Sequence, residues 1–133
     1  MSRFDLNMDD FREGIMKATY PYHPTMPSMD LRMRQASLLV EEIGEYMAAA
    51  RNGDFVEMID ALADIIVYAE QGFREMGLDA QPFMEMVHQS NMSKANGHRD
   101  AGGKWIKPTD GTYVPPDIPA ILLSHYGTEE IPK

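Results

Sequence analysis

Two apolar stretches of the sequence, residues 38–50 and 59–69, carry carboxylates as their only charged side chains. Helices that are apolar all round are normally buried. An isolated buried carboxylate costs too much free energy to remain without a partner. No Lys or Arg lies between Gln35 and Ala50, or between Asn52 and Gly72, to pair with these acids locally. They must therefore be paired elsewhere in the fold, protonated or bound to metal.

Helical periodicity predicts four helices along the chain and no convincing strand. The second and third should form an antiparallel hairpin, because the helix-terminating pair Asn52 and Gly53 separates them. Ser28 or Asp30 is expected to cap the second helix, and Asp54 the third. The expected helices cover residues 8–19, 31–51, 54–76 and 80–93, followed by a mostly loop tail with a short apolar piece at residues 118–123. The sequence thus predicts one all-α domain, residues 1–133, with a loop-rich C-terminal tail.

The carboxylates of the two stretches are spaced so that they can meet. Glu41, Glu42 and Glu45 share one broad helical face, and Asp60 and Asp64 lie four residues apart on the next helix. Counted outward from the turn of an antiparallel hairpin, Glu45 comes level with Asp60, and Glu41 with Asp64. A cluster of four or five carboxylates offers only oxygen ligands, which suits Mg²⁺ or Mn²⁺ rather than zinc. The alternative is a solvated acidic face.

Composition excludes several classes of function. The 133 residues contain no cysteine, which rules out a thiol nucleophile, a cysteine metal site and a disulfide framework. The absence of cysteine suits a cytoplasmic protein, and we expect that location. No apolar run approaches the roughly 20 residues needed to cross a bilayer, so no membrane association is expected. The formal net charge of -9 argues against nonspecific nucleic-acid binding. A phosphorylated ligand would also be repelled, unless metal ions or a local basic patch reverse the sign.

At the acidic residues the sequence resembles the MazG-like, all-α nucleoside triphosphate pyrophosphohydrolases, relatives of the phosphoribosyl-ATP pyrophosphohydrolases. Their hallmark is a Glu-Glu-x-x-Glu helix followed by a Glu-x-x-Asp helix, and residues 41–45 match the first part fully. In the second part, either Glu57 with Asp60 is the match, or the pair Asp60 and Asp64 replaces it. Glu45 lies opposite Asp60 and Glu41 opposite Asp64 in the expected hairpin, and this favours the pair Asp60 and Asp64. The role of Glu57 stays open.

A second resemblance lies closer to the C-terminus. Three segments look like the C-terminal signature of a phage and bacterial branch of this family: residues 87–94, which contain Asn91 and Lys94, residues 103–108, which contain Lys104 and Lys107, and residues 115–118. Together the matches cover roughly residues 35–120. The resemblance implies a four-helix MazG-like bundle. It also implies hydrolysis of a (deoxy)nucleoside triphosphate to the monophosphate and pyrophosphate, dependent on Mg²⁺ or Mn²⁺.

The residues can be given roles in such a reaction. About two or three ions held by Glu42, Glu45, Asp60 and Asp64 would bind phosphate oxygens and stabilise charge in an in-line displacement. Glu41 adjoins this cluster and is the candidate for orienting or deprotonating the attacking water. The acidity of the chain is then better interpreted as a metal site than as a solvated surface.

Basic residues gather in the segment that would oppose a triphosphate. Lys94, Arg99, Lys104 and Lys107 supply four of the twelve basic residues within fourteen positions. Asn91 and Lys94, three residues apart near a helix end, can contact phosphates together, a role that the family resemblance also implies. Lys104 and Lys107 are candidates to close over the ligand from the loop. For Arg99 we favour a structural role near the helix end.

The sequence says less about which nucleobase the substrate carries and how many copies of the chain assemble. Candidates for a base contact are Trp105 and the loop that contains Tyr20, Tyr22 and His23. The phage MazZ group hydrolyses guanine nucleotides, so a place in that group would imply guanine. A homodimer or homotetramer is expected, because the helices are too apolar for a small monomer to cover. Two alternatives stay open: a phosphoribosyl-ATP pyrophosphohydrolase, and a non-catalytic helical regulator that binds nucleotide.

Overall fold

The computed structural model describes residues 19–133, so the helix expected at residues 8–19 lies outside the described residues apart from its last position. The described chain forms two compact units. Residues 19–79 contain α2 (Met29–Asn52) and α3 (Phe55–Glu75). Residues 80–131 contain α4 (Ala80–Met92), β1 (His98–Arg99), β2 (Trp105–Ile106) and α5 (Ile118–Tyr126). The all-α prediction is confirmed, and α2, α3 and α4 lie within a few residues of the predicted ranges.

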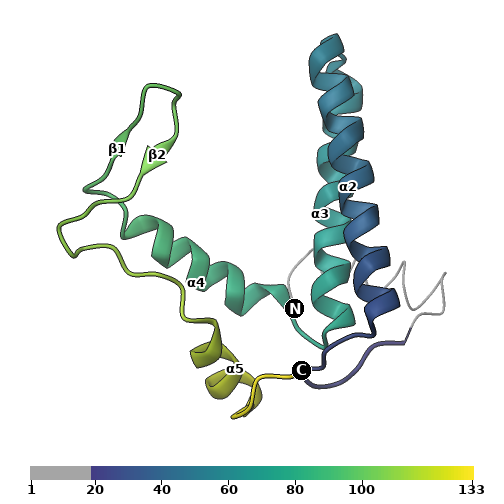
Figure 1. Cartoon of the computed structure of the whole chain (residues 1–133), viewed down its shortest axis with the longest axis vertical. Helices are drawn as coiled ribbons and strands as arrows, with labels where there is room; N and C mark the ends of the chain where they lie inside the picture. The colour runs from purple at the N-terminus through teal and green to yellow at the C-terminus, as the bar shows by residue number, and fades with distance from the viewer. Residues whose placement is uncertain (1–18) are drawn as a thin grey trace. The chain divides into compact units, whose positions relative to one another are not determined.

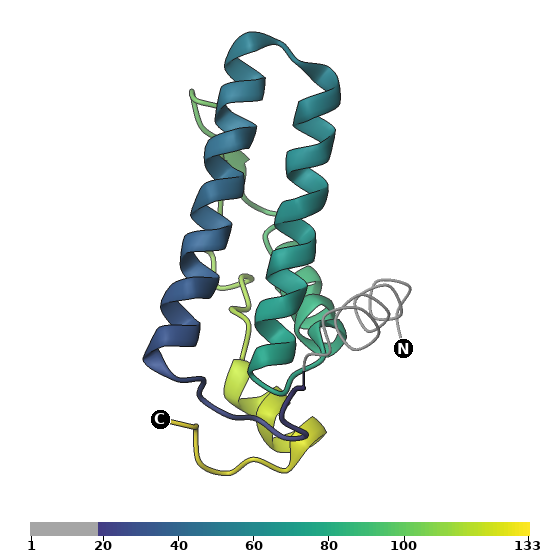
Figure 2. The ribbon, with the colours of Figure 1, turned by 90° about the vertical axis from the view of Figure 1, so that its right-hand side faces the viewer.

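The expected hairpin of α2 and α3 is present, and Figure 2 shows the two helices antiparallel and side by side. Ser28 caps α2 by accepting a hydrogen bond from the amide of Leu31 at 3.2 Å. Gly53 ends α2 in the left-handed conformation, with φ of 67°, a region that non-glycine residues enter at a cost. Asp54 then caps α3 by accepting from the amide of Glu57. These local signals set the length of both helices and therefore which residues face each other across the hairpin.

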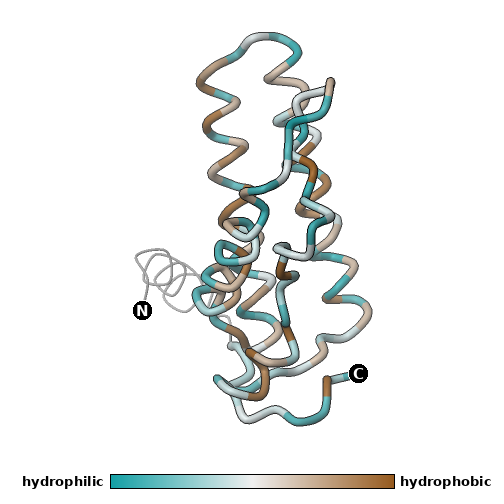
Figure 3. Tube along the Cα trace, turned by 90° about the vertical axis from the view of Figure 1, so that its left-hand side faces the viewer, coloured by the Kyte–Doolittle hydropathy of each residue, from teal (hydrophilic) through white to brown (hydrophobic). Residues whose placement is uncertain are grey.

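The hairpin buries small and polar side chains rather than large apolar ones. Ala49 and Ala61 are among its buried residues, and small side chains at these positions allow close helix packing. Figure 3 shows hydrophobic residues recurring along both helices. Most of the large ones are nevertheless exposed in this chain: Met29, Met33, Val40, Ile43, Met47, Phe55, Val56, Ile59, Leu62, Ile66 and Val67.

The second unit contains two short elements that the sequence analysis did not predict as regular structure. The first is an antiparallel pair of two-residue strands, in which His98 faces Ile106 and Arg99 faces Trp105 (Figure 1). Asp100 holds the connection between them, because its Oδ1 accepts from the amides of Gly102 and Lys104. The expectation of a chain without strands is therefore corrected by this small ribbon, which the Asp100 turn makes possible.

The second unpredicted element is α5, where we expected an apolar piece in a loop. Asp117 caps it by accepting from the amide of Ala120, Pro119 lies in its first turn, and Gly127 ends it at φ 68°. Within this unit α5 packs on α4, and the rings of Phe83 and Tyr126 stack at 6.3 Å between centroids. Each of these signals is readable in the sequence, but a nine-residue helix needs α4 beside it to be stable.

None of the helices in residues 19–133 combines the length and the apolar character needed to cross a membrane. The cytoplasmic location stays a prediction.

Candidate functional site

The five acids of the sequence motif lie on the facing helices of the hairpin. Glu41, Glu42 and Glu45 project from α2, and Asp60 and Asp64 from α3. Glu42 is buried, with 8% of its surface exposed. Asp64 is half-buried, whereas the other three are exposed. Among these five acids Glu42 is therefore the buried one, and the others have more freedom to move.

Glu42 is the most perturbed carboxyl of this group. Burial raises its pKa from 4.5 to about 7, assisted by a hydrogen bond with Glu45 and by repulsion from Glu45, Asp64 and Glu41. One of its oxygens, Oε2, is buried without a hydrogen-bond partner. Buried polar atoms are nearly always satisfied in folded proteins, so an oxygen without a partner is a position where a proton or a cation would be stabilised.

Asp64 connects the two helices electrostatically. Burial raises its pKa, and repulsion from Asp60 and from Glu45 raises it further. Because Asp64 lies on α3 and Glu42 and Glu45 lie on α2, these shifts show that the acidic faces meet across the hairpin. Glu42, Glu45 and Asp64 therefore lie near one another across the hairpin, with Glu41 next to Glu42 and Asp60 one turn from Asp64. Their individual roles stay predictions.

Glu57 lies in the first turn of α3, at the end of the hairpin where the turn is. Glu57 is exposed, lies three residues before Asp60 on α3, and is not among the groups that shift the pKa of Glu42 or Asp64. In residues 19–133 no set of three or more His, Asp or Glu side chains is already arranged to coordinate a metal ion. Coordination by the predicted ligands would require other rotamers, and the side chains of Glu45 and Asp60 are exposed enough to change theirs.

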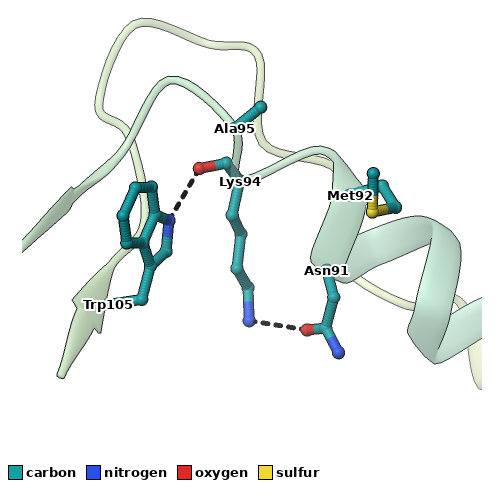
Figure 4. A pocket seen from close by; sticks show the side chains of 5 residues that line it. All are labelled: Asn91, Met92, Lys94, Ala95 and Trp105. Carbon is teal, nitrogen blue, oxygen red and sulfur yellow. Dashed lines mark hydrogen bonds between the residues drawn. The ribbon is translucent and has the colours of Figure 1, made fainter.

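A second group of candidate residues gathers in the other unit, at the end of α4. The ammonium of Lys94 donates to Oδ1 of Asn91 at 2.9 Å. Both residues line a pocket of about 380 Å³ together with Met92, Ala95 and Trp105, as Figure 4 shows. Asn91 and Lys94 therefore lie together at the wall of a pocket, and their contact with phosphates stays a prediction.

Tyr113 joins two of the predicted lysines, and the sequence analysis missed it. The Nζ atoms of Lys94 and Lys107 lie 5.8 Å and 4.9 Å from the centre of its ring, within cation–π range. The adjoining backbone is fixed because the amide of Val114 donates to the hydroxyl of Ser93 at 2.8 Å. Lys104 lies in the connection between β1 and β2, where its backbone pairs with Asp100. No sequence pattern indicated Tyr113, because its ring comes near Lys94 only where the chain between them folds back.

A comparison with known protein families decides the class of this chain. The model of the phosphoribosyl-ATP pyrophosphohydrolase family matches residues 8–91, which is more than half of the sequence. The chain belongs to that family. No curated protein matches the chain.

Membership in the phosphoribosyl-ATP pyrophosphohydrolase family confirms the MazG-like resemblance and makes the protein a nucleotide pyrophosphohydrolase in the general sense. The matched region includes every acid of the cluster and ends at Asn91. Lys94, Lys107, Trp105 and Tyr113 lie beyond it. The family therefore accounts for the acidic helices, while the basic and aromatic residues of the second unit must be interpreted from their own geometry.

Proposed function

We propose that this protein hydrolyses a nucleoside or deoxynucleoside triphosphate to the monophosphate and pyrophosphate, in a reaction that depends on Mg²⁺ or Mn²⁺. The observation that carries the proposal is the buried carboxyl of Glu42. It interacts with Glu45 and Asp64 and keeps one oxygen without a partner. The family match supports the same class of reaction.

Glu42, Glu45, Asp60 and Asp64 would hold the metal ions. Their carboxylate oxygens are the ligands that Mg²⁺ and Mn²⁺ prefer, and a cation would satisfy the orphaned Oε2 of Glu42. When bound, such ions neutralise phosphate charge and lower the pKa of an attacking water. The protein's own contribution is to place several carboxylates on two rigid helices joined by a tight turn.

Glu41 is the proposed acceptor of the water's proton. In the reaction, water adds to phosphorus, the bridging P–O bond between the α- and β-phosphates breaks, and pyrophosphate leaves. The water loses a proton that needs an acceptor. Glu41 is exposed and close enough to Glu42 to raise its pKa, so it borders the cluster without being buried in it.

Asn91, Lys94, Lys104 and Lys107 are the proposed phosphate-binding residues. The ion pairs within residues 19–133 do not include Lys94 or Lys107, so neither ammonium is neutralised by a carboxylate of that region. Two such ammonium groups beside one aromatic ring form a positive patch in an otherwise acidic chain. A polyphosphate is the chemistry that such a patch attracts.

The substrate is tested by measuring pyrophosphate release with Mn²⁺ and Mg²⁺ from all common nucleoside and deoxynucleoside triphosphates and from phosphoribosyl-ATP. We expect turnover of triphosphates, and guanine nucleotides should be preferred if the chain belongs with the phage MazZ group. Turnover of phosphoribosyl-ATP alone would replace the substrate in this proposal. Binding without turnover of any compound would contradict it and favour a non-catalytic regulator.

The acidic cluster is tested by substitutions that remove one charge each. Glu42→Gln and Asp64→Asn should lower turnover by at least about 100-fold, since even residues that only support metal ligands cost up to that much. Glu85→Gln is the matched control, because Glu85 is an exposed acid on α4 that hydrogen bonds with Gln81. Full activity of both variants would contradict the proposal that α2 and α3 carry the catalytic site.

A homodimer or homotetramer is the proposed functional form. Many large apolar side chains on α2 and α3 are exposed in one chain, and burying them against another surface would be favourable. A second copy of the same hairpin offers a matching surface, since symmetric self-association is the commonest way that such faces are covered.

A further inference from the structure

The pocket at the end of α4 has an aromatic wall whose position is fixed. The indole Nε1 of Trp105 donates to the carbonyl oxygen of Lys94 at 2.8 Å, as the dashed line in Figure 4 shows. Gly97 lies against the same indole, where a Cβ would come within 2.8 Å of Nε1. A ring held at its nitrogen on a backbone that approaches closely cannot turn freely, so its orientation toward the pocket is set by the fold.

Trp105 stays 43% exposed despite this fixed position. A tryptophan recruited only for packing usually hides more of its large apolar surface than this. Arg99 lies over the ring, with its Cζ 6.0 Å from the ring centre, but Arg99 does not line the pocket. Trp105 itself lines the pocket and is partly exposed, so some of its indole surface is open to a ligand there.

The pocket combines apolar and cationic walls. Met92, Ala95 and the indole of Trp105 supply apolar surface, whereas Asn91 and Lys94 supply polar groups at one part of the lining. The ammonium of Lys107 shares the Tyr113 ring with that of Lys94, so positive charge continues beyond the lining residues. A volume of about 380 Å³ lies in the range of small-molecule sites. The matching ligand has a flat aromatic part joined to an anionic part.

We infer that Trp105 is the base-stacking residue of this protein: a nucleotide places its base against the indole in this pocket and its phosphates toward Lys94 and Lys107. The inference rests on the proposed function and adds to it the residue that holds the base. Stacking on an aromatic ring tolerates every base, because each base has a π-face. Trp105 therefore gives affinity for nucleotides over bare polyphosphate rather than a choice among bases.

The sequence contains one tryptophan, so intrinsic tryptophan fluorescence reports this pocket alone. The protein is titrated in the presence of Mg²⁺ with an α,β-imido analogue of a nucleoside triphosphate, which resists cleavage at the bond to be hydrolysed. Inorganic tripolyphosphate, which lacks the base, is titrated in parallel, and binding of both is measured by calorimetry. We expect saturable quenching by the analogue and little by tripolyphosphate. Equal quenching by both, binding without quenching, or no binding of the analogue would overturn the inference.

Two substitutions isolate the aromatic surface. Trp105→Phe and Trp105→Leu both lose the hydrogen bond to the Lys94 carbonyl, so any loss of local order is shared between them. We expect the Leu variant to have a KM about 10-fold above that of the Phe variant, because only Phe keeps a ring on which a base can stack. Equal KM values would overturn the inference. A raised KM in Tyr22→Leu but not in Trp105→Leu would do the same, by placing the base at the other candidate loop.

The two proposals fail separately. If nucleotide analogues quench Trp105 but no nucleotide releases pyrophosphate, the proposed function is wrong and the stacking site stands. If pyrophosphate is released but the analogue binds without quenching, the stacking site is wrong and the proposed function stands.

Discussion

At the scale of single residues, Glu42 decides how the acidic hairpin is interpreted. A buried carboxyl surrounded by acids is unfavourable as an anion, and the fold offers it no cationic side chain in the residues that shift its pKa. The protein can relieve this cost by binding a proton or by binding a cation. Proton binding to Glu42 depends on pH, and cation binding depends on the concentration of divalent ions. Both can therefore be measured through their effects on stability.

The first prediction concerns the pH dependence of stability without metal. The folded-state pKa of Glu42 is raised to about 7 from 4.5, so its contribution to stability is present below pH 4.5 and is lost as the pH rises through 7. In EDTA the Tm of the wild type should therefore fall between about pH 5 and pH 8, and Glu42→Gln should flatten this fall. Adding Mg²⁺ at pH 8 should raise the Tm of the wild type more than that of the variant. Parallel pH profiles for the two proteins would count against this account of Glu42.

At the scale of elements, the α2–α3 hairpin depends on a turn of two residues. Gly53 adopts φ of 67° and donates its amide to carbonyls of α2, while Asp54 caps α3. A lengthened or shifted turn would move every acid of one helix relative to the other. The turn therefore sets the register of the acidic cluster as well as the stability of the hairpin.

The second prediction compares two glycines of this hairpin. Gly53→Ala should destabilise the protein by about 1 kcal/mol, because a left-handed conformation penalises a side chain. Gly44→Ala should be neutral or stabilising by a similar amount, since Gly44 is helical and a Cβ there meets no atom within 4 Å. Chemical denaturation of both variants measures the difference. Equal effects would show that the turn conformation is not a constraint.

Sequence reasoning reached some elements and missed others for identifiable reasons. Long periodic helices with clear ends, such as α2 and α3, were predicted because their signals are local. The acids of the cluster were predicted because an unpaired carboxylate in an apolar helix is costly to bury. The β1–β2 ribbon was missed because two-residue strands are too short to show a periodic pattern. The helix α5 and the contact of Tyr113 with Lys94 depend on packing between residues distant in sequence, so local patterns did not reveal them.

At the scale of the whole molecule, the exposed apolar residues of the hairpin and the net charge of -9 have opposite effects on self-association. Net charge keeps copies apart in solution, whereas contiguous apolar surface favours their association. Because the apolar residues lie on the same helices as the acids, association and the candidate site are expected to be linked.

The third prediction tests this association. Val40 is 68% exposed on α2, and Val40→Glu should shift the mass measured by light scattering from an oligomer toward the monomer, because a charge would be buried in the interface. Val114→Glu is the control, since Val114 is similarly exposed but belongs to the other unit. A wild type that is monomeric at micromolar concentration would contradict the proposed assembly.

The most direct test of the central claim is ³¹P NMR of the products formed from a nucleoside triphosphate. With Mg²⁺ or Mn²⁺ we expect equal amounts of pyrophosphate and nucleoside monophosphate, and no products after the ions are removed with EDTA. The Glu42→Gln protein should give the same products far more slowly. Orthophosphate with nucleoside diphosphate, or unchanged product formation in EDTA, would contradict the claim that this acidic hairpin is the metal-dependent site of a nucleotide pyrophosphohydrolase.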